Sequence, residues 1–135
     1  MPGDDLAELS ELDRRLLAAI EERFPVAQSP YCDLGAELGV LETDTLDSVL
    51  KLRGLGEVQA IAAEFDPGTD RLAFSDEDAA LAAAITFDLP WGEHPYAEIA
   101  AQLALQGIER DEAWVLARLQ GWLDDGTVAR ISARR

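Results

Sequence analysis

The strongest constraint on the fold of this chain is an internal repeat, in which residues 10–38 recur as residues 75–103. The two segments align without gaps at a shift of 65 positions, and 11 of the 29 paired positions are identical. The identical pairs are Ser10/Ser75, Asp13/Asp78, Leu16/Leu81, Ala18/Ala83, Ala19/Ala84, Ile20/Ile85, Pro25/Pro90, Pro30/Pro95, Tyr31/Tyr96, Ala36/Ala101 and Leu38/Leu103. The likeness resumes at a shift of 70, where Gly56, Val58 and Ile61 match Gly126, Val128 and Ile131. A repeat of this kind indicates a structural unit that has been duplicated.

Each copy begins with the pattern of a helix N-terminus, a serine followed three residues later by an aspartate. These pairs are Ser10 with Asp13 and Ser75 with Asp78. Apolar residues at helical spacing follow in the first copy, and the helix is predicted to end before Pro25. Pro30 and Pro95 occupy the favoured first position of a second helix. A third helix follows in each copy, which gives the helix order of a helix-turn-helix unit.

Strand-like residues follow the third helix of each copy. Residues 57–65 are predicted to form a strand, Asp66-Pro67-Gly68 a turn and residues 71–74 the return strand of a hairpin. In the second copy only residues 127–132 have this character, so that strand needs a partner from the first wing or from another chain.

The predicted fold is therefore mainly α, with two tandem winged helix-turn-helix units packed as a pseudo-dimer. Each unit has three helices and a small β-wing. The expected divisions are an acidic leader at residues 1–9, the first unit at residues 10–74, and the second at residues 75–135 with a truncated wing. Units of 60 to 65 residues bury little core alone, so we expect them to pack together.

The net charge of −16, from 27 acidic and 11 basic residues, argues against nucleic acid as a partner. Affinity for nucleic acid comes largely from lysine and arginine contacts to phosphate, and this chain has one lysine, Lys51. No apolar run reaches the length of a membrane span and no export signal precedes the first unit. The single cysteine, Cys32, aligns with Ala97 and is predicted to be a small buried residue. These features indicate a cytoplasmic protein.

Several short motifs give the chain a resemblance to a known family. They are Leu12-Asp13-Arg14-Arg15-Leu16-Leu17, Phe24-Pro25, Pro30-Tyr31 and Leu34-Gly35 in the first copy, and Asp88-Leu89-Pro90 with Pro95-Tyr96-Ala97-Glu98-Ile99-Ala100 in the second. With these motifs the chain resembles the siroheme decarboxylase family, Lrp/AsnC-like winged-helix proteins of heme d1 and alternative heme biosynthesis. The resemblance implies a siroheme-type tetrapyrrole as substrate or ligand, no required cofactor, and assembly with other protein subunits.

The family places its tetrapyrrole site in a ferredoxin-like domain that usually follows the winged helix, and here a second winged helix is expected instead. The resemblance thus implies a subunit or accessory protein of a siroheme decarboxylase, a carboxy-lyase, that is not self-sufficient. Two alternatives remain open. In the first, the chain is an acidic tandem winged-helix adaptor that binds another protein. In the second, it is an Lrp/AsnC-like transcription regulator.

The candidate site residues are few, because the chain contains one histidine and one cysteine and no metal-ligand spacing. They are His94, Tyr96, Tyr31, Arg130 and Arg134 for a ligand, and Trp91 for a partner contact. His94 is the possible ligand of a tetrapyrrole iron, and the two arginines are expected to face its carboxylates. The competing interpretation makes His94 a solvated helix-start residue, the tyrosines packing residues and the arginines a solvated tail.

Overall fold

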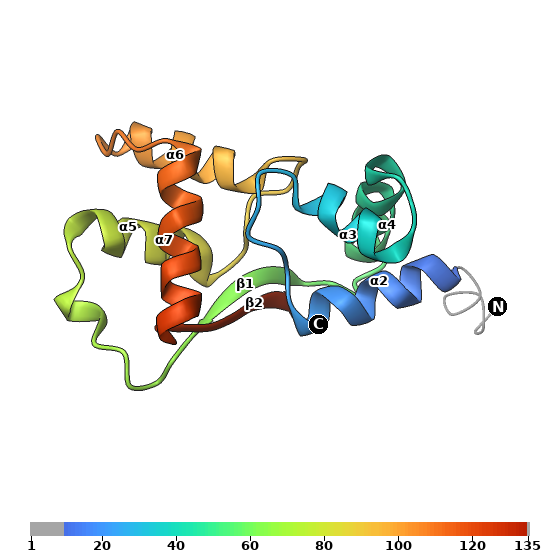
Figure 1. Cartoon of the computed structure of the whole chain (residues 1–135), viewed down its shortest axis with the longest axis horizontal. Coiled ribbons are helices and arrows are strands. Elements are labelled where there is room, and N and C mark those ends of the chain that lie inside the picture. Colours follow the sequence, from blue (N-terminus) through green and yellow to red (C-terminus); the bar gives the residue numbers. More distant parts are fainter. Residues whose placement is uncertain (1–9, 135) are drawn as a thin grey trace.

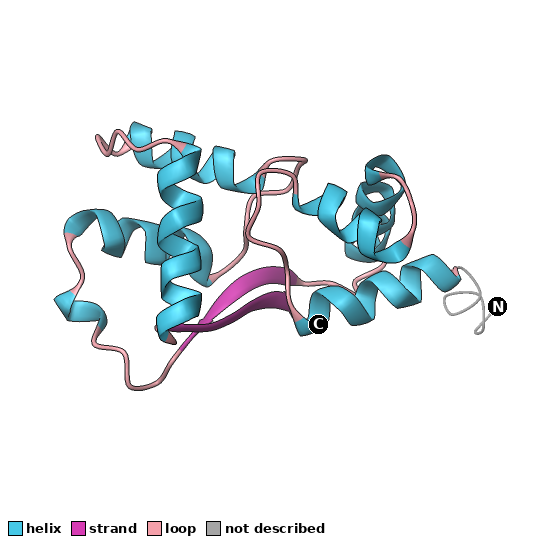
Figure 2. Cartoon of the chain, viewed as in Figure 1, coloured by secondary structure: helices cyan, strands magenta, loops and turns pink. Residues whose placement is uncertain are grey.

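The computed structural model describes residues 10–134, with Arg71 described by its backbone alone. Two clusters of helices flank a short two-stranded ribbon (Figures 1 and 2). The elements in chain order are α2 (Glu11–Glu22), α3 (Pro30–Leu38), α4 (Glu42–Gly54), β1 (Ala60–Phe65), the 3₁₀ helix η1 (Arg71–Ala73), α5 (Asp76–Thr86), α6 (Pro95–Leu105), α7 (Glu112–Asp125) and β2 (Val128–Arg134). The acidic leader predicted at residues 1–9 lies outside the described residues.

The helices begin where the repeat predicts. Ser10 accepts a hydrogen bond from the amide of Asp13, and the Asp13 carboxylate accepts one from the amide of Ser10, which completes a capping box. Ser75 accepts the matching bond from the amide of Asp78. At the end of α3, Gly39 adopts a positive φ of 75°, a conformation that stops a helix at little cost only with glycine.

The small sheet differs from the predicted wing. The hairpin expected between residues 57–65 and 71–74 is wrong, because residues 71–73 form η1. Strand β1 instead pairs with β2 in an antiparallel ladder, so the strand of the second copy finds its partner in the first. Of the two partners considered for that strand, the first wing is therefore the one observed.

The register of the β1–β2 ladder follows the repeat. Ala62 pairs with Ser132, and these two residues are equivalent at the shift of 70. On either side, Ile61 pairs with Ala133 and Ala63 with Ile131, so the ladder reads alike from both strands.

The connections between α2 and α3 and between α5 and α6 bind to this ladder in matching ways. The amide of Phe24 donates to the carbonyl of Ile131 at 2.6 Å, and the amide of Leu89 donates to the carbonyl of Ile61 at 2.7 Å. Helix α2 packs against β2, whereas α5 packs against β1. The first helix of each copy thus contacts the strand of the other copy, and the two halves are interlocked.

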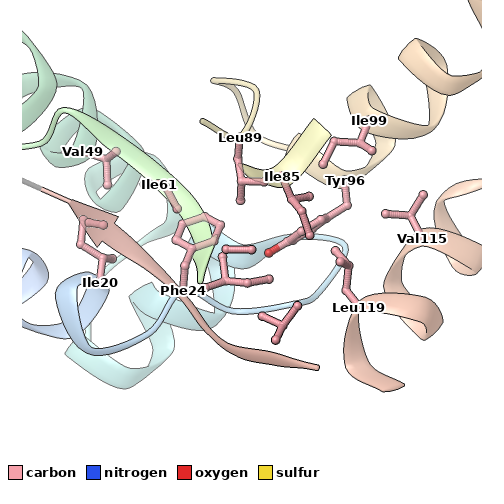
Figure 3. Packing of buried hydrophobic residues seen from close by; sticks show 14 of the residues in the cluster. Ile20, Phe24, Val49, Ile61, Ile85, Leu89, Tyr96, Ile99, Val115 and Leu119 are labelled. Carbon is pink, nitrogen blue, oxygen red and sulfur yellow. The ribbon is translucent and has the colours of Figure 1, made fainter. Parts of the chain in front are cut away.

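A single apolar core runs through both halves, and Figure 3 shows a part of it. Repeat-equivalent positions are buried together, each side chain being at most 6 % exposed. The pairs are Leu16/Leu81, Ile20/Ile85, Phe24/Leu89, Tyr31/Tyr96, Leu34/Ile99, Leu52/Trp122, Val58/Val128 and Ile61/Ile131. Cys32, which was predicted to be buried, is exposed, because α3 turns Tyr31 and Leu34 toward the core and the intervening position toward solvent. None of the helices in residues 10–134 is long and apolar enough to span a bilayer.

Candidate functional site

A hollow of about 450 Å³ opens where the two halves meet. Its walls come from the connection after α2, from α3, from α7 and from β2, so residues far apart in the sequence share it. The lining residues are Arg23, Phe24, Pro25, Val26, Asp33, Glu37, Gln120, Leu123, Ala129, Arg130 and Ile131. A volume of this size falls within the range of small-molecule sites, which are commonly about 300–1,000 Å³.

The hollow combines apolar walls with two arginines. Phe24 and Ile131 are buried side chains in its lining. The Arg23 guanidinium lies 3.7 Å from the Glu37 carboxylate, and Nε of Arg130 donates to the Glu64 carboxylate at 3.0 Å. All four of these charged side chains are more than half exposed, and exposed pairs of this kind contribute little to stability. An incoming carboxylate can therefore compete for either guanidinium.

Of the two predicted arginines, only Arg130 lines the hollow. Arg134, four residues further along β2, donates from Nη2 to the carbonyl of Ala63 at 3.1 Å. The structure therefore separates these two candidates.

The predicted tyrosines lie in the core beside the hollow. Tyr96 is fully buried, and its hydroxyl donates to the carbonyl of Pro25 at 2.7 Å. Figure 3 shows this ring projecting from α6 with its hydroxyl directed toward the N-terminal half. Tyr31 packs edge to face against Phe24, with ring centroids 5.7 Å apart. Burial raises the pKa of Tyr31 to about 12 and raises the pKa of Tyr96 as well, so both phenols are neutral at physiological pH.

His94 is the residue that precedes α6, and its side chain is 51 % exposed. Its Nδ1 lies 2.9 Å from the carbonyl oxygen of Gln28, in the connection between α2 and α3. A carbonyl only accepts, so this bond places a proton on Nδ1 and directs the Nε2 lone pair of the neutral ring outward. The hydrogen bond to Gln28 raises the pKa of His94, desolvation opposes this by a smaller amount, and the charges of Glu93 and other nearby carboxylates raise the pKa further. His94 is not among the residues that line the hollow.

The side chain of Trp91 takes part in a cluster with Arg53 and Asp88. The Arg53 guanidinium forms two hydrogen bonds of 3.1 Å with the Asp88 carboxylate and lies 3.7 Å from the centroid of the Trp91 ring. The indole Nε1 donates to Asp88 at 2.8 Å, and the amide of Ile61 donates to the same carboxylate at 2.9 Å. Burial alone would raise the pKa of Asp88, but these donors outweigh burial and the pKa is lowered. Trp91 is 50 % exposed, as expected for a contact residue, yet its ring and N–H are already engaged within the chain.

Sequence reasoning did not identify Arg53 and Asp88 as a pair, nor Arg23 as a lining residue. One signal was present in the repeat: Asp88 aligns with Arg23, so equivalent positions carry opposite charges. Opposite charges at equivalent positions indicate that Arg23 and Asp88 have different surroundings in the two copies.

The surface of α4, the third helix of the first half, is acidic and apolar. Asp44 and Asp47 are exposed on it, with Leu41 at 70 % and Leu50 at 44 % exposure. Helices that read bases most often present arginine, lysine, asparagine or glutamine at such positions. The two exposed carboxylates on this face disfavour the approach of a phosphate backbone.

The fold and these surfaces define a mainly helical protein with a helix-turn-helix and a small antiparallel sheet. Residues 13–57 match the family model described as the siroheme decarboxylase NirDL-like HTH domain. The siroheme decarboxylase alpha subunit of Desulfovibrio desulfuricans (strain ATCC 27774 / DSM 6949 / MB) is 37 % identical over 60 residues, which are 44 % of this chain and 35 % of that protein. The siroheme decarboxylase NirH subunit of Paracoccus pantotrophus is 36 % identical over 52 residues, 38 % of this chain and 32 % of that protein. These matches confirm the resemblance to the siroheme decarboxylase family, and the matched segments span about a third of each relative.

Solved structures extend the likeness of the fold to nearly the whole chain. Crystal structures of the siroheme decarboxylase NirDL, one of them in co-complex with an iron-uroporphyrin III analogue, superpose with a TM-score of 0.77. Each alignment covers 92 % of this chain, at 16 % sequence identity, and 65 % or 66 % of the NirDL chain. At that identity the likeness concerns the fold alone.

Proposed function

We propose that this chain is a siroheme decarboxylase-family component, a subunit or accessory protein that acts in the cytoplasm in heme d1 or related tetrapyrrole biosynthesis. The observation that carries the proposal is the match of residues 13–57 to the family's helix-turn-helix domain. The similarity of fold over 92 % of the chain supports it. Because the relatives are named as subunits, we expect this chain to work with other polypeptides and not alone.

In this proposal the two halves, residues 10–74 and 75–135, are winged helix-turn-helix units arranged as a pseudo-dimer. The mirrored register around Ala62 and Ser132 supports the arrangement. So do the equivalent amide bonds from Phe24 and Leu89 to the strand of the other copy. In each unit the wing is reduced to one strand, and the two strands complete a single ribbon.

His94 is the proposed ligand of a tetrapyrrole iron. Histidines that bind a metal usually donate their second ring N–H to a carbonyl or carboxylate, which fixes the ring and leaves the other nitrogen for the metal. The bond from Nδ1 to the Gln28 carbonyl has this form, and among the described residues the Glu93 carboxylate lies 4.0 Å from Nε2. Within residues 10–134 no cluster of three or more His, Cys, Asp or Glu side chains is arranged to hold a metal ion, so an iron would be brought by the tetrapyrrole itself.

The tetrapyrrole carboxylates are assigned to the arginines of β2. Arg130 is placed for this by its exposed guanidinium in the wall of the hollow. Arg134 would first have to release the Ala63 carbonyl. Tyr96 contributes by holding Pro25, a lining residue, and Tyr31 by packing against Phe24, another one.

Absorbance titration with siroheme tests the proposal. The wild-type chain is expected to shift the siroheme spectrum in a saturable way, and His94→Ala is expected to lose the shift while keeping its circular dichroism. A spectrum that neither protein changes would contradict tetrapyrrole binding. An equal shift with both proteins would remove His94 from the site while leaving the ligand.

The acidic face of α4 favours one second candidate, an adaptor that binds a basic protein surface. Exposed leucines beside Asp44 and Asp47 offer apolar contact and charge complementarity together. Affinity purification with the wild type and with a Leu41→Ser/Leu50→Ser variant tests this candidate. A basic partner retained by the wild type and lost by the variant, without any response to siroheme, would favour the adaptor.

A further inference from the structure

The hollow has an equivalent region on the other side of the pseudo-dimer. The comparison of these two regions rests on the pseudo-dimer arrangement in the proposed function. At the shifts of 65 and 70, Arg23, Val26 and Leu123 of the hollow correspond to Asp88, Trp91 and Arg53. Deeper in the walls, Phe24 and Ile131 correspond to the buried residues Leu89 and Ile61. The two places thus have similar apolar floors and different rims.

On the other side of the pseudo-dimer, three side chains of the protein itself, Arg53, Asp88 and Trp91, occupy the region equivalent to the hollow, which we call the filled side. The Asp88 carboxylate and the Trp91 ring lie against the Arg53 guanidinium, joined by two ion-pair hydrogen bonds and a stacking distance of 3.7 Å. A guanidinium beside an aromatic ring and a carboxylate combines a bidentate ion pair with a cation–π contact. The Arg53 side chain is 2 % exposed, so its guanidinium is buried within this cluster.

On the open side, which is the hollow itself, the equivalent residues are Arg23, Val26 and Leu123. These positions carry no carboxylate, no aromatic ring and no buried guanidinium. Valine replaces tryptophan and leucine replaces arginine, which removes side-chain volume and leaves the space of about 450 Å³. Arginine replaces aspartate, so the charge at the rim is reversed. Arg130 adds a second guanidinium, at a position where the first copy has Ala60.

We infer that this hollow is a binding site for an aromatic or similarly flat group that carries carboxylates. The apolar walls would receive the ring, in the space that Trp91 and Arg53 fill on the other side. Arg23 and Arg130 would bind carboxylates in place of Glu37 and Glu64, their present partners. Asp33 and Glu37 also line the hollow and disfavour anions that reach neither arginine, which gives the site a requirement for suitably placed carboxylates.

Calorimetric titration with naphthalene-2,6-dicarboxylate tests the site, with naphthalene-2,6-dimethanol as the neutral probe. The dicarboxylate is expected to bind saturably and the diol at least 10-fold more weakly. Arg23→Gln and Arg130→Gln are each expected to weaken binding of the dicarboxylate by about 10-fold or more, since each removes a charge-assisted contact. Arg110→Gln is the matched control, because Arg110 also pairs with a glutamate at the surface, Glu77, and is not among the residues that line the hollow.

A variant that rebuilds the filled side supplies the decisive comparison. Arg23→Asp, Val26→Trp and Leu123→Arg together place the residues of the closed cluster in the open position. This triple variant is expected to keep the wild-type melting temperature or exceed it and to lose binding of the dicarboxylate. If the triple variant does not fold, the two single arginine variants, both at exposed positions, still decide the outcome.

Absence of saturable binding by the wild type, or equal binding by wild type and Arg23→Gln, would overturn the inference. Iron-uroporphyrin III is a tetrapyrrole probe, and comparison with the dicarboxylate shows whether the hollow takes a tetrapyrrole or a small aromatic acid. If both probes compete for the hollow, the carboxylate edge of a tetrapyrrole is its occupant. If the dicarboxylate binds and neither iron-uroporphyrin III nor siroheme gives a spectral change, the site stands as one for small aromatic acids and the proposed function fails.

Discussion

The hydroxyl of Tyr96 donates a 2.7 Å hydrogen bond to the carbonyl oxygen of Pro25, which lies 71 residues earlier in the chain. This bond joins the second half to the connection between α2 and α3 in the first. The equivalent tyrosine of the first copy, Tyr31, has no matching bond to Pro90 within the described part of the chain. The repeat is therefore asymmetric at the point where it approaches the hollow.

Replacing Tyr96 with phenylalanine should destabilise the protein by about 1 kcal/mol, the usual net contribution of one intramolecular hydrogen bond. Urea unfolding followed by circular dichroism measures this change. Tyr31→Phe is the matched control and should change the free energy of unfolding by less. Equal losses in the two variants would show that the hydroxyl of Tyr96 has no particular role.

Asp13 should make stability depend on pH in the acidic range. Burial alone would raise the pKa of this carboxyl, but hydrogen bonds from Lys51, Ser48 and the Ser10 amide outweigh burial and lower the pKa to about 2. Because the folded pKa lies below the unfolded value of 3.8, the contribution is present above about pH 4 and is lost as the pH falls toward 2. The shift corresponds to about 2 kcal/mol.

The measurement is the free energy of unfolding between pH 2 and pH 6 in wild type and Asp13→Asn. The variant should be less stable at pH 6, and its stability should change less across this range. Asp44→Asn, at an exposed position on α4, is the matched control for the loss of one carboxylate. A profile for Asp13→Asn parallel to that of the wild type would contradict the assignment.

The repeat allowed much of the fold to be predicted, because caps, prolines and apolar spacing are local signals. The partner of β2 could not be chosen, since a strand sequence states its propensity and not its neighbour. The Asp66-Pro67-Gly68 turn suggested a hairpin, but the edge of β1 was taken by β2. Arg130 could be proposed as a ligand-binding residue from its charge, and it lines the hollow, whereas the Arg53–Asp88 pair depends on a contact across 35 residues and between two halves. The hollow itself arises from differences between the copies, which become meaningful only when both are placed in space.

Removal of the Asp88 carboxylate should be costly, because it leaves the Arg53 guanidinium buried without its partner. The Arg53 side chain is 2 % exposed and that of Asp88 is 33 % exposed, so Asp88→Ala should destabilise the protein by about 3 kcal/mol. Glu77→Ala breaks a similar pair with Arg110 at the surface and should cost no more than about 1 kcal/mol. Thermal unfolding of both variants compares the two pairs, and similar costs would mean that burial of Arg53 has little effect.

DNA should not bind to this chain at physiological salt. The net charge of −16 repels a polyanion, and Asp44 and Asp47 occupy the exposed face of the helix that would enter the major groove. Fluorescence anisotropy with a labelled random duplex should show no binding at 150 mM salt. A shift that weakens steeply with salt would instead support the regulator hypothesis.

The two halves should unfold as one unit, because each first helix packs on the strand of the other half. All three tryptophans, Trp91, Trp114 and Trp122, lie in the second half, and Trp91 and Trp122 also contact the first half through Arg53 and Phe65. Fluorescence therefore reports on the second half and on its contacts with the first. Ile20 is fully buried in the first half, and Ile20→Ala should cost about 2 to 5 kcal/mol. The fluorescence midpoint in urea should fall by the same amount as the midpoint from circular dichroism, as two-state unfolding requires. A fluorescence midpoint that stays at the wild-type value while circular dichroism shows an earlier transition would mean that the halves fold independently, and the interlocked arrangement would then not hold the molecule together.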